Sequence, residues 1–458
     1  MLQKAQTITS VAKPNLRSIE RFGAALAATA ILLAPALWNG FPLLQFDTGG
    51  YIARWHEGTL EESRSPVYGL FLNAFEHVDF WLAVLVQAAL TVWVLALMLR
   101  VQGFGGKPRF LLLTTVLLSL GTTLPWIAGV LITDIFAGLS VLALYLLVLR
   151  SAALAGWERA ALFLLIAFSA ATHSATLIVL LGLLAAGFLA ALLDRRLVRL
   201  SALATGLTAL VAGAAMLVAA NYAVAGRVAW TPGGDALLFG RMLQAGIVAR
   251  YLNEHCPDPR FTLCAHRDEL PANADDFFWG GGLFDRLGRF QGLGDEMRAI
   301  ALECLAQYPW EQVKAAVSAT AEQLVRVATG YGVHNEVLHT YGIIQRYVPS
   351  AVPAMRSARQ QKGELDFTAI NRVHLPVAWA SMLLLLGIIA LAIRSRRFAD
   401  LGALAATAAV AIIANAVVCG AISNPNDRYG ARMAWLAPFV LVLAGLRAAD
   451  RNLAAFEG

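Results

Sequence analysis

Charged residues stand directly beside the apolar stretches of this chain, and their types could bind and activate a phosphorylated substrate. Asp47 follows the first apolar run in "QFDTGGYIARW", and Arg64 comes shortly afterwards in "ESRSPVYG". Near the other end of the chain, "NDRYGAR" contains Asp427, Arg428 and Tyr429. A carboxylate can take a proton from an attacking hydroxyl, whereas guanidinium groups bind phosphate through charge-assisted hydrogen bonds. We therefore predict that Asp47 is catalytic and that the other four residues bind the substrate.

Two further polar residues, Asp134 in "LITDIFAGL" and His173 in "SAATHSATL", lie near the ends of apolar runs. Charged groups within membrane spans are energetically costly, so they are candidates for a functional role. Both residues are predicted to lie near the same membrane boundary as Asp47. We therefore include both in the predicted substrate-binding site.

Each of these residues also has an explanation that involves no substrate. Asp47 could be solvated at a helix end, Asp134 could pair with an arginine, and His173 could be a hydrogen-bonded interfacial histidine. Arg428 could extend its charge to the membrane surface, and the tyrosine after it could belong to the interfacial aromatic belt. Arg64 could be a solvated loop residue.

The elements that position these residues are predicted to be membrane-spanning helices. Of the 458 residues, 58% are hydrophobic and only 14% are charged. A soluble domain carries about 25% charged residues, so the composition predicts an all-α polytopic membrane protein. A spanning helix needs about 20 mainly apolar residues. Ten stretches are predicted to span: 22–44, 80–99, 109–127, 130–149, 159–174, 175–193, 198–222, 374–393, 399–421 and 430–446.

The distribution of basic residues predicts the orientation of these spans. If the N-terminus is cytoplasmic, every short loop on that side is basic, as the positive-inside rule requires. The residues concerned are Arg100, Lys107, Arg109, Arg150, Arg159, Arg195, Arg196, Arg199, Arg394, Arg396, Arg397, Arg447 and Arg451. We predict the inner membrane of a bacterium, with both termini cytoplasmic and the long loop periplasmic. The net charge of +6 then reflects topology and does not indicate a nucleic-acid partner.

This topology divides the chain into three parts. Residues 1–224 form a predicted seven-span module that includes a first outer loop at 45–79, and residues 374–458 form a three-span module. Between them, the segment 225–373 is too long and too polar to be a linker. Stretches such as 295–330 have apolar residues at helical spacing, which predicts a mainly helical periplasmic domain.

The cysteines of the outer segment indicate a disulfide. Cys256 and Cys264 enclose two prolines in "CPDPRFTLC", and an oxidising periplasm would favour their pairing. The alternative is a structural metal site that includes His255 and His266, although the CxxC spacing typical of zinc sites is absent. The remaining two cysteines are predicted to be buried thiols: Cys304 and Cys419.

The layout resembles the GT-C superfamily of integral-membrane glycosyltransferases, which use polyprenyl-phosphate sugars. In that superfamily the first span leads into an acid-bearing outer loop, and a seven-span module, a long outer loop and a variable set of spans follow. Here "FDTGGYIARW" follows the first span, and "TDIFAGLSVLALYLL" is similar to the superfamily's fourth span. "NDRYGARMAWLAPFVLVL" is similar to its Arg-Tyr and Pro pattern in the last span.

The resemblance implies an inverting glycosyltransferase that moves a sugar from a polyprenyl-phosphate donor to a glycan, lipid or protein acceptor. Asp47 matches the position of the catalytic acid, Asp134 matches a frequent second polar position, and Arg428 matches a position that meets the donor phosphate. The paired acids found in the first loop of several members are missing here. The resemblance therefore leaves the use of a divalent cation open, while no cofactor is firmly implied and no metal ligand is assigned.

Other functions fit parts of the same pattern. A polymerase or ligase of lipid-linked glycans would use closely related chemistry. A transporter of such glycans would have polar groups at mid-membrane depth and inverted repeats, and neither is visible in the sequence. A non-enzymatic envelope assembly protein would depend on its outer domain and would be indifferent to Asp47.

Overall fold

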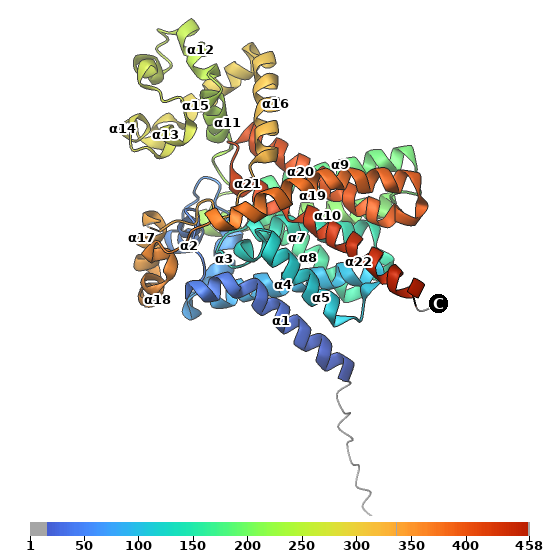
Figure 1. Cartoon of the computed structure of the whole chain (residues 1–458). Coiled ribbons are helices and arrows are strands. Elements are labelled where there is room, and N and C mark those ends of the chain that lie inside the picture. Colours follow the sequence, from blue (N-terminus) through green and yellow to red (C-terminus); the bar gives the residue numbers. More distant parts are fainter. Residues whose placement is uncertain (1–15, 336, 457–458) are drawn as a thin grey trace, which may run out of the picture.

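The computed structural model describes residues 16–335 and 337–456, so residues 1–15 of the predicted N-terminal module lie outside the described residues. Within this part of the chain the regular secondary structure is helical, and extended pairing is limited to isolated bridges. Figure 1 shows the long helices α9, α10, α19, α20 and α22 gathered in one bundle, with α11 to α15 displaced to one side of it. The chain is an all-helical polytopic membrane protein.

Seven helical segments in the described residues are long and apolar enough to cross a membrane. They begin and end close to seven of the ten predicted spans. They are α1 (Leu16–Asn39), α4 (Trp81–Leu99), α9 (Ser174–Leu193), α10 (Leu200–Ala225), α19 (Thr368–Arg394), α20 (Ala399–Ile422), and α21 (Asp427–Ala434) continuing into α22 (Leu436–Phe456). Each backbone bonds within its own helix, which is what a hydrocarbon environment requires.

The other three predicted spans coincide with shorter helices. They are α5 (Pro108–Gly121), α7 (Asp134–Leu149) and α8 (Gly156–Thr172). With 14, 16 and 17 residues they are shorter than the roughly 20 that a hydrocarbon core about 30 Å thick requires. The number of spans beyond seven therefore stays a prediction.

Helix α7 forms the centre of the bundle, because it is apolar on every side and is buried along nearly its whole length. It packs against α4, α8, α10 and α21. Gly138 permits the approach of α21, since a Cβ atom there would lie only 2.6 Å from the Trp435 ring. The first residue of this buried helix is Asp134, so the chain carries a carboxylate into the interior.

The loop at 45–79, predicted to be the first outer loop, forms two short helices, α2 (Thr48–Glu57) and α3 (Pro66–Asn73). Gly49 allows α2 to pack tightly against α17, because a Cβ atom there would lie 2.7 Å from the Thr340 Cα atom. From the sequence, the segment after Gly50 is expected to be interfacial, with Tyr51 on the bilayer surface, and for Tyr51 this expectation is wrong. The Tyr51 ring is fully buried and contacts the Tyr68 ring edge to face, because α2 packs on α3 and α17 and is thereby enclosed.

The outer segment predicted as one domain buries its apolar side chains in two separate clusters. Five helices form a small domain with its own core: α11 (Gly234–Gln244), α12 (Ile247–His255), α13 (Ala274–Trp279), α14 (Leu283–Arg286) and α15 (Arg289–Gln307). By contrast, α17 (Leu338–Tyr347) and α18 (Val352–Ser357) contribute to the core of the main bundle, beside α2 (Figure 1).

The helical stretch expected at 295–330 is divided by Pro309, which lacks a backbone N–H and starts a new helix. Helix α15 therefore ends at Gln307, and α16 (Pro309–Val325) begins in a different direction. Helix α16 connects the small domain to the ends of α20 and α21.

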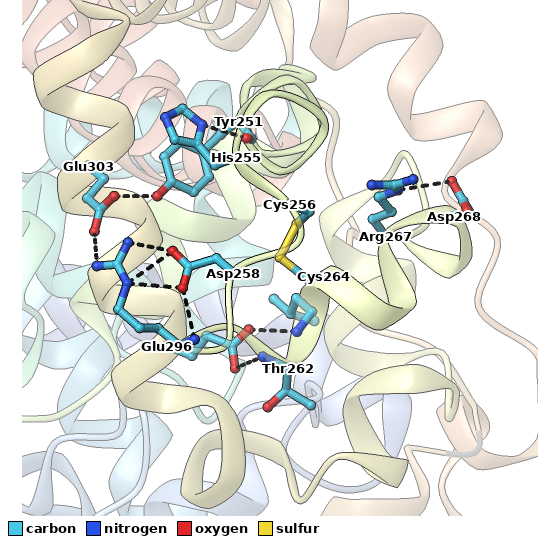
Figure 2. The surroundings of a disulfide bond; sticks show 12 residues. Tyr251, His255, Cys256, Asp258, Thr262, Cys264, Arg267, Asp268, Glu296 and Glu303 are labelled. Carbon is cyan, nitrogen blue, oxygen red and sulfur yellow. Dashed lines mark hydrogen bonds and ion pairs between the residues drawn. A yellow bond between two sulfur atoms is a disulfide. The ribbon is translucent and has the colours of Figure 1, made fainter.

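The structure contains a disulfide between Cys256 and Cys264, at the end of α12 (Figure 2). Asp258 lies between the two cysteines and binds Arg260, which also reaches Glu303 of α15. Glu296 of α15 accepts the backbone N–H groups of Thr262 and Leu263 at 3.0 and 2.7 Å. The loop is thus fixed to α15 by hydrogen bonds as well as by the disulfide. The other two cysteines, Cys304 and Cys419, are buried and free.

Replacing both disulfide cysteines (Cys256→Ser with Cys264→Ser) is expected to destabilise the small domain by about 2–3 kcal/mol. The link closes a short loop, with a sequence separation of 8, and so restricts the unfolded chain. The loss of stability is measured by heating the detergent-solubilised protein and detecting unfolding through limited proteolysis within residues 226–308. A reductant should lower the midpoint of the wild type to that of the variant and leave the variant unaffected. Equal midpoints for all samples would contradict the prediction.

Candidate functional site

Asp47 lies near the start of the loop at 45–79, immediately before α2, and the surrounding backbone fixes its position. Its backbone N–H donates to Gln45 Oε1 at 2.8 Å. The Thr48 hydroxyl donates to the Leu131 carbonyl just before α7, at 3.0 Å. Thr340 of α17 donates to the Gln45 carbonyl at 3.0 Å. The loop is therefore held by α7 and α17 together, and the Asp47 carboxylate does not depend on a mobile turn.

The carboxylate of Asp47 lies between two arginines. Arg64 Nη2 donates to Oδ1, and Arg428 Nη1 donates to Oδ2 at 2.5 Å. The Asp47 side chain keeps 18% of its surface exposed, so the cluster remains open to a ligand from outside. Gly50 gives Arg64 room, since a Cβ atom at that position would lie 3.0 Å from the arginine's Cγ.

Arg428 binds a second carboxylate at the same time. Its Nε donates to Asp134 Oδ2 at 2.7 Å, and its Nη2 lies 3.3 Å from Asp134 Oδ1. Asp134 is 1% exposed and Arg428 is 8% exposed. Asn426 caps α21 by accepting the Arg428 N–H at 2.9 Å, which starts the helix at this point. Arg428 consequently joins the first loop, α7 and α21.

A third arginine, Arg432, lies one helical turn further along α21 and is completely buried. It donates to Asn415 Oδ1 of α20 at 3.0 and 2.8 Å, and it lies 3.2 Å from Cys419 Sγ. The nearest carboxylate oxygen among the described residues is that of Asp134, at 3.9 Å. The Tyr429 ring lies 5.4 Å from the Arg432 guanidinium and 5.8 Å from that of Arg428.

The cluster contains three guanidinium groups and two carboxylates, so it carries an excess of one positive charge. Burying an uncompensated charge is costly, and a bound anion would remove that cost. Glu61 lies at the partly exposed rim, where its carboxylate binds Arg54 at 2.7 Å and also interacts electrostatically with Arg64, so it offsets only part of this buried charge. The electrostatics therefore favour a negatively charged ligand beside Arg64, Arg428 and Arg432.

Polar atoms near the cluster are buried without a hydrogen-bond partner among the described residues. They are Arg64 Nε, His173 Nδ1, Tyr51 Oη and Thr133 Oγ1. His173 interacts electrostatically with Asp47, Arg428 and Arg432, which places it at this site. The Tyr51 and Thr133 hydroxyls lie near each other, but neither has a partner of good geometry. Unpaired polar groups of this kind are expected where a ligand binds.

The two arginines determine the protonation of Asp47. Burial alone would raise the pKa of its carboxyl, but Arg64 and Arg428 outweigh burial and lower that pKa from 3.8 to about 2. The group is therefore ionised at neutral pH. While both arginines occupy its oxygens, however, it is a weak base.

Of the residues singled out from the sequence, the structure brings six together: Asp47, Arg64, Asp134, His173, Arg428 and Tyr429. Asp427 does not join them. Its Oδ1 accepts the Ala328 N–H at 2.9 Å and so attaches α21 to the segment after α16. Gly430 permits this contact, because a Cβ atom there would lie 1.9 Å from the Arg326 carbonyl oxygen. Among the described residues, no group of three or more His, Cys, Asp or Glu side chains could hold a metal ion.

The predicted site omitted three residues that the structure places there. They are Arg432, Tyr51 and Asn415. Asn415 is an isolated amide within the apolar stretch "AIIANAVV", and that isolation was the available signal. The pairing of Asn415 with Arg432 depends on how α20 and α21 cross, which the sequence does not specify.

A cavity of about 260 Å³ lies close to the cluster, beneath the segment that follows α16. Its polar lining is uncharged: Thr329, His334, Asn335 and Gln360. Gln45 separates it from Asp47, since the side-chain amide of Gln45 packs against Gly332. Phe46 contacts the His334 ring at 5.2 Å. The cavity therefore differs chemically from the arginine cluster.

Comparisons of the chain with protein-family models, with curated proteins and with solved structures found no match.

Replacing Asp134 by asparagine is expected to destabilise the protein by about 3–5 kcal/mol, because Arg428 and Arg432 would lose a buried counter-charge. Thermal unfolding in detergent measures the effect. Asp285→Asn is the matched control, because Asp285 pairs with Arg289 at the surface, where the two side chains are 39% and 44% exposed, and it should cost about 1 kcal/mol or less. Equal losses for the two variants would contradict a buried charge network.

The ion pairs of Asp47 should give a defined pH dependence of stability. The folded-state pKa of about 2 lies below the ordinary value of 3.8, so the stabilisation is present above about pH 4 and is lost as the pH falls towards 2. The difference in unfolding midpoint between wild type and Asp47→Asn measures it. This difference should stay constant down to about pH 4 and then shrink. A decrease that begins near pH 6 would rule out the assigned ion pairs.

Proposed function

We propose that this protein is an inverting glycosyltransferase that transfers a sugar from a polyprenyl-phosphate donor to an acceptor hydroxyl. The observation that supports this most strongly is the carboxylate of Asp47 held between two arginines, at the outer ends of membrane helices. The site would lie at the periplasmic face of a bacterial inner membrane, in a GT-C-like chain of ten spans with cytoplasmic termini. The lipid tail of the donor would lie between spans.

The arginines would bind the donor phosphate. A polyprenyl-phosphate sugar is a phosphodiester with one negative charge, which matches the single excess positive charge of the cluster. When the bond between the anomeric carbon and the phosphate oxygen breaks, the leaving polyprenyl phosphate gains a second charge. Arg64 and Arg428 would bind that group more strongly in the transition state than in the ground state, which lowers the barrier.

Asp47 would act as the general base once the phosphate has engaged the arginines. The phosphate competes with Asp47 for the same N–H groups of Arg64 and Arg428. When those groups turn to the phosphate, the interactions that lower the pKa of Asp47 weaken, while its burial still raises that pKa. The carboxylate then takes the proton of the acceptor hydroxyl as its oxygen attacks the anomeric carbon from the face opposite the phosphate. Donor binding would therefore precede activation of the acceptor.

Two other residues have suitable positions in this scheme. Arg432 supplies positive charge beneath Arg428, and the unpaired His173 Nδ1 is available to a sugar hydroxyl. The uncharged cavity beyond Gln45 suits a neutral saccharide acceptor better than it suits the phosphate. If that acceptor is itself a lipid-linked glycan, the same reaction amounts to polymerisation or ligation.

The variant Asp47→Asn should separate binding from transfer. Without the competing carboxylate, polyprenyl monophosphate should bind about tenfold more tightly, because two charged hydrogen bonds no longer have to be exchanged. Transfer of sugar from the polyprenyl-phosphate donor should fall about a thousandfold. Native mass spectrometry measures the binding, and product formation measures the transfer. Normal transfer by this variant would exclude the role of Asp47 as base.

The variant Arg64→Gln should bind polyprenyl monophosphate at least about tenfold more weakly than the wild type, since one charge-assisted contact is lost. Arg359→Gln is the matched control. Arg359 is an exposed arginine that pairs with Glu364 outside the cluster, and its loss should leave binding unchanged. An equal effect of both substitutions would mean that the lipid phosphate responds only to general surface charge.

A further inference from the structure

Helix α16 carries a stripe of exposed apolar side chains. Trp310 and Val317 are each 65% exposed, Val313 is 49% exposed and Val325 is 56% exposed. Their spacing of three, four and eight residues places them on one side of the helix. Ala321 is also exposed on this side, and Leu324 is partly exposed. A stripe of this length on a domain surface indicates a partner surface that is itself apolar.

The opposite side of α16 packs against α20 and α21. Ala319 and Gln323 are each 1% exposed. A Cβ atom at Gly420 would lie 2.7 Å from the Ala319 carbonyl oxygen, so the two helices cross at very close range. The Gln323 amide binds the backbone of Asn426 in both directions, at 2.8 Å each. This crossing fixes the rotation of α16 and turns its apolar stripe away from the bundle.

The crossing lies near the end of α20, where the predicted topology puts the outer membrane boundary. Gly420 is close to the outer end of α20, which ends at Ile422. At the C-terminal end of α16, the Val325 carbonyl accepts the indole N–H of Trp379 at 3.0 Å. Trp379 belongs to the apolar part of α19, and interfacial tryptophans have this combination of an apolar ring and a polar N–H. In Figure 1, α16 stands at a steep angle to α19 and α20. Because α19 and α20 are long and apolar enough to span, this angle points α16 along the membrane surface.

The surface of α20 beside this crossing is apolar and exposed. Val417 and Ile413 lie on the same side of α20 as Gly420, one turn and two turns further from the end of the helix. Val417 is 46% exposed and Ile413 is 52% exposed. These side chains form part of the lipid-facing surface of a spanning helix. Helix α16 therefore projects over bilayer lipid, and its exposed stripe is continuous with the lipid-facing surface of α20.

We propose that α16 is an interfacial helix whose apolar stripe lies in the outer leaflet, so that the bilayer itself covers the stripe. Two basic residues fit this position. The exposed Lys314 lies on the same side of α16 as the stripe, and Arg326, which pairs with Glu322, follows the end of the helix. Both can hold their charges at the headgroups while their stems remain apolar. The small domain formed by α11 to α15 is then attached to the membrane surface through α16 as well as through the chain that leads from α10. This inference does not depend on the proposed transferase activity.

Fluorescence quenching by nitroxide-labelled lipids tests this position. A cysteine introduced by Val317→Cys would carry a small fluorophore, while the native free thiols, Cys304 and Cys419, are buried and unreactive. The full-length protein would be reconstituted in phospholipid nanodiscs that contain lipids with the nitroxide near the top of the acyl chain. Asp268→Cys, at a side chain of the small domain that is 93% exposed, is the control.

We expect quenching at position 317 to be at least about threefold stronger than at position 268, as for a side chain buried at the headgroup boundary. A second labelled variant, Glu322→Cys, lies at the polar edge of α16 and should give an intermediate value. Quenching at 317 no greater than at 268 would overturn the proposal. In that case, concentration-dependent shielding of the label in detergent would identify a second copy of the chain as the partner of this surface.

Discussion

Arg428 binds Asp47 and Asp134 simultaneously, and the arrangement of the outer half of the molecule depends on this double ion pair. Its partners come from the loop at 45–79 and from the start of the deeply buried helix α7, while Arg428 itself lies in the first turn of α21. Because all three groups are largely removed from water, none of them can relax towards solvent if one is displaced. The same interaction therefore holds the fold together and positions the charges that would meet a substrate.

An arginine that serves both purposes raises the question of how a ligand could bind without disrupting the fold. The geometry separates the two tasks within one guanidinium group. Nε and Nη2 face the fully buried Asp134, whereas Nη1 faces the partly exposed Asp47. A phosphate could replace Asp47 at Nη1 and at Arg64 while the bond to Asp134 persists. Structural stability and ligand exchange thus involve different edges of the same side chain.

The sequence predicts the helical membrane architecture well, because long apolar runs have few alternatives in a bilayer. It also predicts that Asp47, Asp134 and Arg428 lie near one boundary, since topology alone brings the ends of alternate spans to the same side. Contacts that depend on helix crossing could not be predicted. The burial of Tyr51 depends on α17 packing against α2, and these helices are separated by almost 300 residues of sequence. The pairing of Arg432 with Asn415 likewise requires the angle between α20 and α21.

The division of the outer segment shows the same limitation. Amphipathic periodicity indicates that a helix has a buried side, but it does not identify the partner. The apolar residues of α17 and those of α11 look equivalent in sequence, yet they belong to different cores. Local signals did work in this region: Pro309 marks a break in the helix, and the close spacing of Cys256 and Cys264 marks the disulfide.

The close contact between Gly138 and Trp435 has a consequence for how the charge cluster is aligned. Gly138 lies one turn into α7, after Asp134, and Trp435 directly follows the helix that contains Arg428 and Arg432. The indole N–H also donates to the Arg432 carbonyl at 3.1 Å. The carboxylate of α7 and the arginines of α21 are therefore brought into register by steric fit inside the apolar bundle. Long-range electrostatic attraction alone would tolerate many relative positions of the two helices, whereas a flat ring against a bare backbone tolerates few.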